Sequence, residues 1–489
     1  MTRGSRLATL SFLALACQPA PGSQADVVVQ HVTVIDGANA PARTGMSVAI
    51  SGERISAILP DGRITPGAGT RVIDGRGKFL VPGLWDMHVH LGSYGARAFP
   101  LFLANGVTSI RETGGALVVS LGLREAVRTG RALGPQLLIA GPSLNGEVMA
   151  GAMPATAESA ATLGVTPSRA ARAVDSLADA GVDFIKVHAA LSRESWSAIT
   201  TAAKRRGLAV IGHVPDGMTP REVIEGGQRT IEHGSAIEFA NATGGDDIAA
   251  RATAALERYH DSAGTGARPR DIIRMRLDAS AKAMQAYDTG AARQFARYAA
   301  AREVWIVPTL VTYQLFVRQL EPELWDLPET RFVPHDVSSL DISRPAVPGT
   351  PAAIAEGKRQ WEEAKLSFRE LVKAGARFAA GTDAPVGPLV PGFSLQRELS
   401  LLAEIGLSPH EVLLAATRNA ADASGRLSDA GTIEVGKFAD LVLLDANPLT
   451  DVRHFSRINA VVTRGRVLER AALDSMLAAA VADSGSRAP

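Results

Sequence analysis

The sequence predicts a (β/α)8 barrel joined to a small composite β-sandwich domain that is built from both ends of the chain. Eight short apolar runs, each ending in polar residues, alternate with helical patterns through the middle of the sequence. Such alternation is typical of a parallel sheet covered by helices. Short β-branched runs with tight turns stand near both ends. The alternative for the middle is an open doubly wound sheet, but no Gly-x-Gly-x-x-Gly turn follows the first strand.

Residues 1–25 predict a secretory signal. Arg3 and Arg6 precede an uncharged apolar run, residues 7–16, and a Pro/Gly/Ser-rich stretch follows. Cys17, the only cysteine of the chain, stands at this boundary in a segment that resembles a bacterial lipobox. The alternative is ordinary cleavage after Ala25. Either way we expect an extracytoplasmic protein without an internal disulfide, as a lipid-anchored protein of the bacterial periplasm or outer membrane, or secreted.

The β domain is predicted in two parts, residues 26–80 and residues 426–472. Both contain short runs of β-branched residues separated by turn residues such as Asp36-Gly37 and Ser51-Gly52. Because the two parts share this pattern and bracket the long middle segment, we expect them to form one domain. The Ala/Ser/Gly-rich residues 473–489 predict a tail that frays.

The barrel is predicted over residues 81–425. We expect its first strand to run from the apolar stretch 79–84 to His88, and the other seven to end near Glu112, Gly141, His188, His213, His233, Thr309 and Asp383. A charged, Ala-rich helical segment from about 240 to 300 predicts an insertion after strand six. The Pro-rich residues 319–356 predict a long loop after strand seven. Long loops at this end of a barrel shape access to a site.

The composition is that of a globular protein, with 46% hydrophobic and 21% charged residues. Lys plus Arg total 51 against 50 Asp plus Glu, so the charge balance gives no sign of a nucleic-acid partner. No apolar run reaches the roughly 18 residues that span a bilayer. We therefore expect contact with a membrane only through an N-terminal lipid anchor.

Metal-competent side chains stand at the ends of five predicted strands. His88 and His90 are two residues apart, so they share one face of the first strand. The other members end strands four, five, six and eight: Lys186, His213, His233 and Asp383. The carboxyl ends of barrel strands converge on one mouth. We therefore expect four imidazoles, an amine and a carboxylate to meet in one cup.

This set predicts a centre of two divalent metal ions, with zinc the expected metal. Zinc binds imidazole nitrogen and carboxylate oxygen, and its catalytic sites leave one position for water. Burial disfavours the ammonium form of Lys186, and the neutral amine can react with carbon dioxide to give a carbamate that bridges two ions. Asp383 would bind one ion and act as the general base. Such a centre suits hydrolysis of a carbonyl substrate.

The motifs around these residues resemble the metal-dependent amidohydrolase superfamily, in its imidazolonepropionase-like and prolidase-like branch. The resemblance covers residues 26 to about 470 and is carried by residues 81–90, 212–215, 231–234, 381–385 and 431–441. It implies that His88, His90 and Asp383 hold the first metal and that His213 and His233 hold the second. It also implies a bridging, carboxylated Lys186, general-base catalysis by Asp383, and cleavage of a C–N bond in a small amide, peptide-like molecule or cyclic amide.

Two departures from that branch concern the substrate. Its dipeptidases carry a Gly-Gly-His loop after strand three and a tyrosine two residues after the strand-five histidine. This chain has residues 141–146, Gly-Pro-Ser-Leu-Asn-Gly, in the loop and Pro215 in place of the tyrosine. The usual contacts to a free α-carboxylate are therefore missing, which argues against a dipeptidase.

Four further residues are candidates for contacts around the site. His188 shares a strand face with Lys186 and either contacts substrate or supports a ligand. Arg111 either meets an anionic group of the substrate or pairs with Glu112. Tyr313 is a candidate wall of the pocket, and Asp86 is expected to support the strand-one histidines without touching metal.

Two other functions remain open from the sequence. One is a mononuclear, imidazolonepropionase-like cyclic-imide hydrolase or deaminase, with Lys186 unmodified. The other is a non-catalytic metal-binding lipoprotein, against which the presence of Asp383 argues, because a binder needs no proton shuttle. The sequence also leaves the oligomeric state open, a homo-oligomer included.

Overall fold

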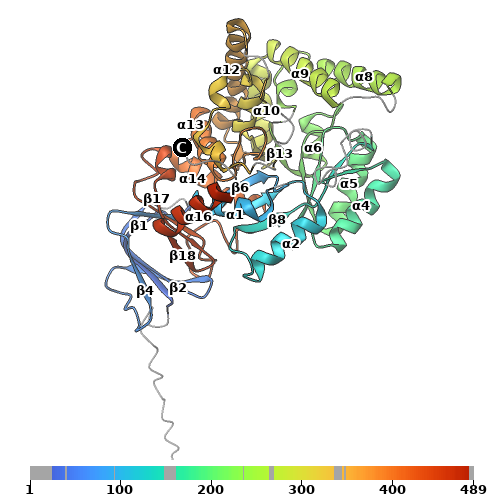
Figure 1. The fold of residues 1–489 in the computed structure, drawn as a ribbon. Helices are drawn as coiled ribbons and strands as arrows, with labels where there is room; N and C mark the ends of the chain where they lie inside the picture. Colours follow the sequence, from blue (N-terminus) through green and yellow to red (C-terminus); the bar gives the residue numbers. More distant parts are fainter. Residues whose placement is uncertain are drawn as a thin grey trace, which may run out of the picture.

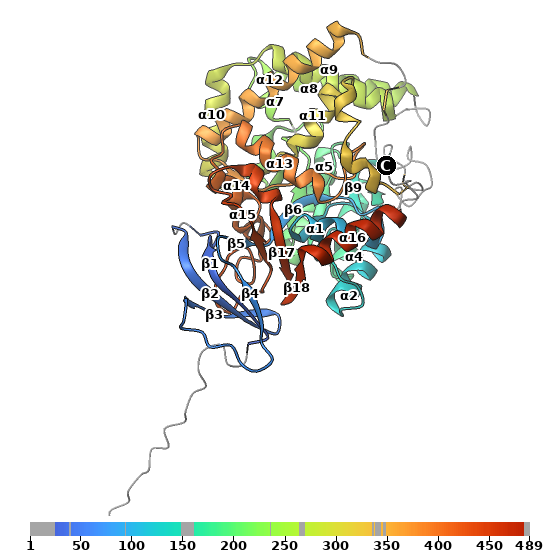
Figure 2. The same cartoon turned by 60° about the vertical axis from the view of Figure 1, so that its left-hand side comes forward.

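The computed structural model describes residues 25–483 except 39–40, 93, 148–160, 235, 264–268, 335–336, 338–343 and 346–348. A β domain and a larger barrel with surrounding helices lie side by side (Figures 1 and 2). The signal predicted over residues 1–25, Cys17 included, lies outside the described residues, save Ala25. Among the described helices, none has the length and apolar character needed to cross a membrane.

Strands from both ends of the chain pair in one eight-stranded sheet, in the order β18-β17-β16-β5-β1-β2-β3 with β4 beside β1. Pairing of β16 with β5 joins the two parts, with Val442 opposite Val81. The strands thus form one continuous sheet to which both ends of the chain contribute, and side chains from both parts share one core, including Val48 and Leu443. Their bounds are Val27–Val34 (β1), Arg43–Ser51 (β2), Arg54–Pro60 (β3), Arg71–Asp74 (β4), Phe79–Pro82 (β5), Leu441–Leu444 (β16), Ile458–Thr463 (β17) and Arg466–Glu469 (β18).

The barrel strands are parallel and follow the predicted order along the chain. The last strand returns to the first, since Met87 N donates to Ala380 O at 2.9 Å and Val89 bridges to Ala384. The eight strands are Leu84–Val89 (β6), Val107–Glu112 (β7), Gln136–Ile139 (β8), Phe184–Val187 (β11), Ala209–Gly212 (β12), Gln228–Glu232 (β13), Trp305–Val307 (β14) and Arg377–Phe378 (β15). Two short strands, Ser143–Asn145 (β9) and Thr162–Gly164 (β10), extend the sheet at one edge.

The predicted first strand is divided between the two domains, so the prediction that it begins at residues 79–84 is wrong. Gly83 N donates to Asp440 O in the β domain at 2.7 Å, whereas Leu84 N donates to Gly106 O in the barrel at 3.0 Å. A Cβ on Gly83 would lie 2.0 Å from Thr108 Oγ1. The chain therefore changes sheets at a glycine because only a residue without a side chain fits there.

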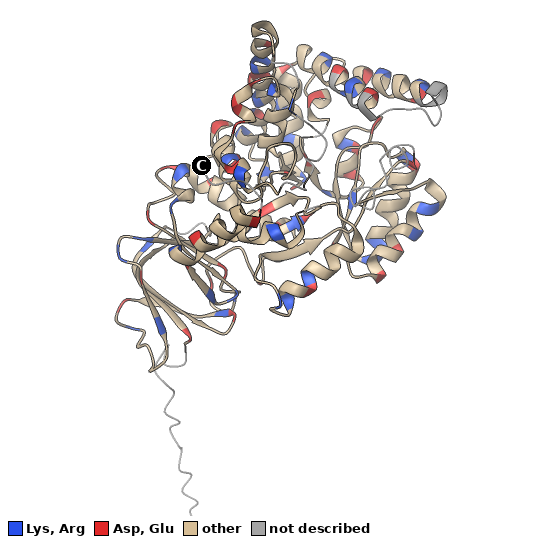
Figure 3. Ribbon diagram, viewed as in Figure 1, with Lys and Arg blue, Asp and Glu red and all other residues tan. Residues whose placement is uncertain are grey.

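The helices between the strands cover the outside of the barrel (Figure 2). Figure 3 shows basic and acidic residues interspersed on these outer helices, in keeping with a formal net charge of +1. The helices are Ala98–Ala104 (α1), Leu117–Arg128 (α2), Pro167–Asp179 (α4), Arg193–Arg206 (α5), Pro220–Glu225 (α6), Thr289–Ala301 (α10), Leu310–Arg318 (α11), Pro351–Lys373 (α12), Phe393–Glu404 (α13), Pro409–Ala415 (α14) and Arg418–Ala423 (α15).

A helical insertion follows β13, where the sequence predicts one, and contains Ile237–Ala240 (α7), Gly245–Ala263 (α8) and Pro269–Gln285 (α9). Figure 1 shows α8 and α9 as an outlying layer. Arg276 of α9 forms an ion pair with Asp216, which follows β12, and Ser280 donates to Glu238 of α7. The insertion is thus tied to the loops at the carboxyl ends of the strands.

The expectation of a frayed tail from residue 473 is wrong for the described residues, because Arg470–Asp483 form helix α16. Leu473 is completely buried, and Met476, Leu477 and Ala480 pack against the same core. This spacing puts apolar side chains on one face of a helix that packs on α1. The many small residues of this segment make the helical spacing of its apolar residues hard to recognise in the sequence. In the structure, those apolar residues pack on the barrel domain.

Candidate metal centre

The six side chains predicted to bind metal lie together at the carboxyl ends of the barrel strands. Asp383 is at the centre, with its Oδ1 3.1 Å from Nε2 of His90 and 3.3 Å from Nε2 of His88. Its Oδ2 lies 3.7 Å from Nδ1 of His233. His88, His233 and Asp383 each offer one ligand atom, and these three atoms lie within 4.8 Å of one another.

Lys186 and His213 complete the cluster. Lys186 Nζ, on β11, lies 3.3 Å from Nε2 of His88, and the residue is only 2% exposed. The ring of His213 is 4.6 Å from that of His233 and 4.2 Å from that of His188, between centroids. Five strand ends thus supply one cluster, as the sequence predicts.

The ends of β13, β14 and β15 hold their residues in an unusual backbone conformation. His233, Thr309 and Asp383 have φ values of 60°, 44° and 63°, in the left-handed region that non-glycine residues seldom adopt. His233 Nδ1 lies 2.8 Å from Thr309 Oγ1, which fixes the ring. Such conformations persist where the surrounding structure imposes them, and they are frequent at functional sites.

Buried partners hold the ligands from below. His90 Nδ1 lies 3.1 Å from Gly114 O, and His88 Nδ1 lies 2.8 Å from Glu232 Oε2. Asp86 accepts hydrogen bonds from the backbone N–H and the hydroxyl of Thr382, at 3.0 and 2.7 Å. Asp86 therefore fixes the residue next to Asp383, and it also accepts from His88 N at 3.3 Å, which is the expected support of a strand-one histidine.

Burial sets the charge of the imidazoles. It lowers the pKa of His88 and His213 well below the usual value, and that of His233 to about 4. For His90, burial also opposes the charged form, but the hydrogen bond to Asp383 and its charge raise the pKa. Three of the four rings are therefore neutral near pH 7 and keep a lone pair for a metal.

The surroundings of the other two members of the cluster, Lys186 and Asp383, favour the neutral amine and the ionised carboxylate, respectively. Burial lowers the pKa of Lys186 to about 8, although Glu232 and Asp383 attract its charged form. For Asp383, burial favours the neutral acid, but the neighbouring His233 and His90 lower the pKa below the usual value. The lysine thus has a fraction of neutral amine near pH 7, and the carboxylate stays ionised.

The cluster fits a divalent metal. His213 Nδ1 is buried and has no hydrogen-bond partner among the described residues, which leaves a lone pair or a proton unsatisfied. Imidazole nitrogen together with carboxylate oxygen is the donor set that zinc prefers. Of the six side chains, His88, His233 and Asp383 have ligand atoms close enough together to hold a metal ion.

Of the three predicted substrate contacts, His188 lies beside the cluster, Tyr313 contacts the insertion, and Arg111 lies inside the barrel. His188 packs on His213 and remains partly exposed. Tyr313 is partly buried on α11, and its hydroxyl lies 3.6 Å from Met284 Sδ of the insertion. Arg111 is 1% exposed and donates to Met87 O and Glu232, so its guanidinium lies inside the barrel and does not face substrate.

Sequence reasoning missed Glu232 and Thr309. Each lies beside a residue that the sequence singled out, Glu232 before His233 and Thr309 at the end of strand seven. Their partners, His88 and His233, come from other strands. A sequence pattern within one strand therefore gave no signal for either contact.

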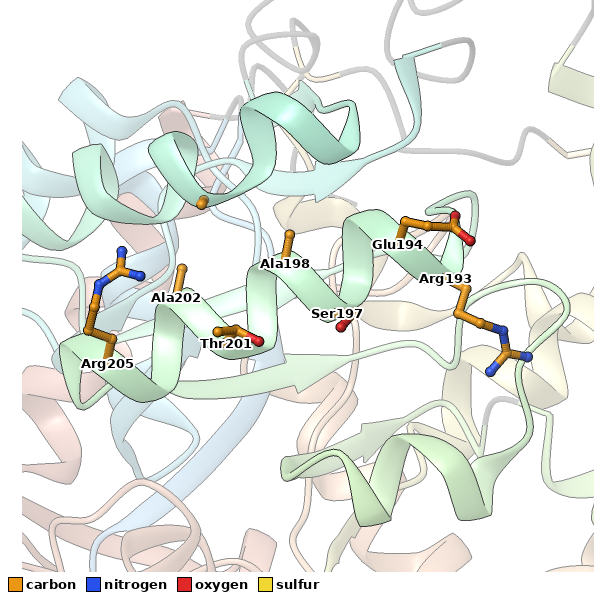
Figure 4. A pocket seen from close by; sticks show the side chains of 8 residues that line it. Arg193, Glu194, Ser197, Ala198, Thr201, Ala202 and Arg205 are labelled. Carbon is orange, nitrogen blue, oxygen red and sulfur yellow. The ribbon is translucent and has the colours of Figure 1, made fainter.

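A cavity of about 590 Å³ lies away from this cluster, between α4 and α5. Figure 4 shows its lining side chains along α5, with Arg193 and Arg205 near opposite ends. Arg205 donates to Asp175, and Arg193 donates to Gly217 O at 2.8 Å. Both guanidinium groups are thus already paired, and the cavity adds nothing to the metal centre.

Comparison with known proteins identifies relatives of the chain. A model of the amidohydrolase family matches residues 79–468. An imidazolonepropionase from Geobacillus sp. (strain WCH70) is 37% identical over 132 residues, 26% of this chain and 31% of the relative. An adenine deaminase 3 from Rhizobium johnstonii is 31% identical over 203 residues, 39% of this chain and 32% of the relative. The alignments span about a third of the length of these curated relatives.

Solved structures resemble nearly the whole chain. A bottromycin amidohydrolase superposes with a TM-score of 0.70 and 22% identity, covering 94% of this chain and 90% of that one. An Xaa-Pro dipeptidase with bound methionine gives a TM-score of 0.63 and 20% identity, covering 91% and 99%. At these identities the superpositions establish the fold only, with both the barrel and the attached β domain included.

Proposed function

Because this chain belongs to the amidohydrolase family, we propose that it is a metal-dependent hydrolase that cleaves a C–N bond of a small amide, peptide-like or cyclic amide substrate. The observation that carries the proposal is the position of Asp383 among His88, His90 and His233. Hydrolysis of such a bond needs a general base beside an electrophilic centre, and the cluster would supply both the base and the ligands for that centre.

We propose two divalent ions, with zinc as the metal. His88, His90 and Asp383 would hold one, His213 and His233 the other. The unpartnered His213 Nδ1 supports this assignment, since a metal would satisfy it. When bound, the ions would supply Lewis acidity, which polarises a carbonyl and lowers the pKa of water.

Lys186 is proposed to bridge the ions as its carbamate. Its neutral amine would attack carbon dioxide, forming an N–C bond and releasing one proton, to give an anionic carbamate. The supporting observation is the burial of Nζ next to the ligand His88, together with a pKa lowered to about 8 by burial. An amine without a proton is the form that reacts.

Asp383 is proposed to move the proton. The ionised carboxylate accepts a proton from the attacking water as the new C–O bond forms. It then donates that proton to the nitrogen as the C–N bond breaks, so the products are a carboxylic acid and an amine. The neighbours that keep Asp383 ionised, His233 and His90, support this role.

The site is proposed to act outside the cytoplasm. The basic, apolar and small-residue segments at the N-terminus support export, and the residues before Cys17 favour a lipid anchor. The expected partner is a small-molecule substrate. Labelling with a radioactive fatty acid would distinguish the anchored protein from a secreted one cleaved after Ala25.

A hydrolysis screen with the purified chain tests the proposal. N-acyl amino acids, dipeptides, lactams and aryl amides are offered to the chelator-treated protein, with and without added zinc, and the bound metal is counted. We expect zinc-restored hydrolysis with two ions per chain. One ion per chain with activity would instead favour a mononuclear cyclic-imide hydrolase or deaminase, and tight zinc binding without turnover of any class would favour a metal-binding protein.

A further inference from the structure

Glu232 lies below the cluster, in the interior of the barrel, and is completely buried. Its carboxylate connects three strands. Oε2 lies 2.8 Å from His88 Nδ1 on β6, Oε1 accepts from Arg111 Nη2 on β7 at 2.7 Å, and Oε1 also accepts from Thr230 Oγ1 on β13. No role in the reaction proposed above requires this carboxylate, so its burial needs another reason.

The contact with Glu232 fixes which nitrogen of His88 carries the proton. Arg111 pairs with this carboxylate at 2.7 Å, and a carboxylate in such a pair only accepts hydrogen bonds, so His88 Nδ1 is the donor. The lone pair of the neutral ring then lies on Nε2, which is 3.3 Å from both Asp383 Oδ1 and Lys186 Nζ. The ring therefore presents its lone pair to the cluster.

Arg111 in turn fixes Glu232. Its Nε donates to Met87 O, the backbone next to His88, at 2.7 Å, while Nη2 donates to Glu232. The planar guanidinium thus joins the strand that carries His88 to the carboxylate that orients it. The guanidinium also lies over the aromatic ring of Phe184, 5.6 Å from its centroid.

His88 differs in this respect from the other histidines proposed as ligands. His90 Nδ1 is near the backbone Gly114 O, and His233 Nδ1 is near the hydroxyl of Thr309. Of the four histidines proposed as ligands, only His88 has a carboxylate of the described residues on the side of its ring away from the cluster. A carboxylate behind a ligating imidazole makes it a stronger donor than a carbonyl or hydroxyl does.

We propose that Glu232, held by Arg111, is a positioning residue that orients His88 and strengthens its binding of the metal ion. This inference rests on the metal centre of the proposed function. Loss of such a partner reduces metal affinity by about 10–100-fold. Glu232→Gln keeps the size of the side chain but removes the charge, so we expect its Zn²⁺ affinity to fall by about tenfold or more.

The test measures Zn²⁺ dissociation constants of the full-length chain by competition with a chelator, and records the visible absorption spectrum of the Co²⁺-loaded protein. The matched control is Asp440→Asn, which removes a buried carboxylate in the β domain that bonds Gln136 and Arg464. We expect the control to keep wild-type affinity and spectrum, and Glu232→Gln to change both. A purely structural role would lower Tm but leave the Co²⁺ spectrum of the folded protein unchanged.

Wild-type affinity and spectrum in folded Glu232→Gln would overturn the inference while leaving the metal centre in place. Failure of the wild-type chain to bind Zn²⁺ would instead overturn the proposed function. Should Glu232→Gln not fold, Thr230→Val removes a single donor to Glu232. A several-fold weaker Zn²⁺ affinity of Thr230→Val at unchanged Tm would support the positioning role, and unchanged affinity would contradict it.

Discussion

Oδ1 of Asp383 lies 3.1 Å from Nε2 of His90, which joins the end of the last barrel strand to the end of the first. The backbone repeats this connection, since Asp383 N donates to His88 O at 2.7 Å. The proposed general base and two proposed ligands therefore lie where the last barrel strand closes onto the first. Gly381 permits this close approach of the two strand ends, because a Cβ at this position would lie only 3.0 Å from His88 N.

Asp383→Asn should abolish proton transfer while keeping the shape of the side chain. We expect the rate of hydrolysis to fall by about 10²–10⁴-fold, the usual contribution of a general base. The control is Asp422→Asn, since Asp422 is a partly exposed residue that lies 3.7 Å from Arg229 and away from the cluster. Steady-state kinetics on the substrate found in the screen provide the measurement. Wild-type turnover of Asp383→Asn would exclude this residue as the base.

Lys186→Ala should remove the proposed bridge. We expect the variant to lose one of the two ions and nearly all turnover, because the second ion would then have only two protein ligands, His213 and His233. Lys365→Ala is the matched control, since Lys365 is also buried but pairs with Glu362 and Glu404 on the outer helices. Metal content per chain and activity are measured on both variants. Two ions and full activity in Lys186→Ala would contradict the bridging role.

Glu398 should make stability depend on pH. Burial raises its pKa to about 8, although Leu310 N and Val311 N donate to its carboxyl oxygens at 3.0 and 2.8 Å. The folded chain then keeps a proton that the unfolded chain releases above its ordinary pKa of 4.5. The free energy of unfolding should therefore fall by roughly a few kcal/mol as the pH rises from about 4.5 to about 8.

Glu398→Gln removes this titration, so the variant should lose less stability over the same pH range than the wild-type chain. Asp86 and Glu112, whose pKa values burial raises to about 7, leave part of the slope in place. Urea denaturation of the metal-free chain at several pH values provides the measurement. The exposed Glu404→Gln should keep the wild-type slope, and an equal slope in Glu398→Gln would show that Glu398 does not titrate on unfolding.

Much of the barrel and of the cluster of candidate ligands can be predicted from the sequence because the signals are local. Each strand end is an apolar run followed by a polar residue, and parallel strands of a barrel place those ends at one mouth. His88, His213 and Asp383 are thus brought together by topology alone. The family match over residues 79–468 agrees with this interpretation.

What the sequence does not reveal depends on contacts between distant residues. In the sequence, Arg111 is a candidate for a contact with substrate because it lies near the end of a strand. In the structure, its guanidinium pairs with Glu232 from another strand. The apolar run 79–84 looks like one strand, yet Gly83 divides it between two sheets. In both cases a partner far along the chain decides the outcome, and a single strand carries no information about that partner.

Helix α16 gives a last prediction, because its residues look like a frayed tail in the sequence. Leu473→Ala removes a completely buried side chain and should lower the free energy of unfolding by about 2–5 kcal/mol. Leu366→Ala, at a residue that is 40% exposed on α12, should change it by less than about 0.5 kcal/mol. Zinc affinity should be unchanged in both, since α16 packs on α1 and supplies none of the proposed ligands. Urea denaturation of the two variants compares them directly, and equal stability would mean that α16 does not dock on the barrel in solution.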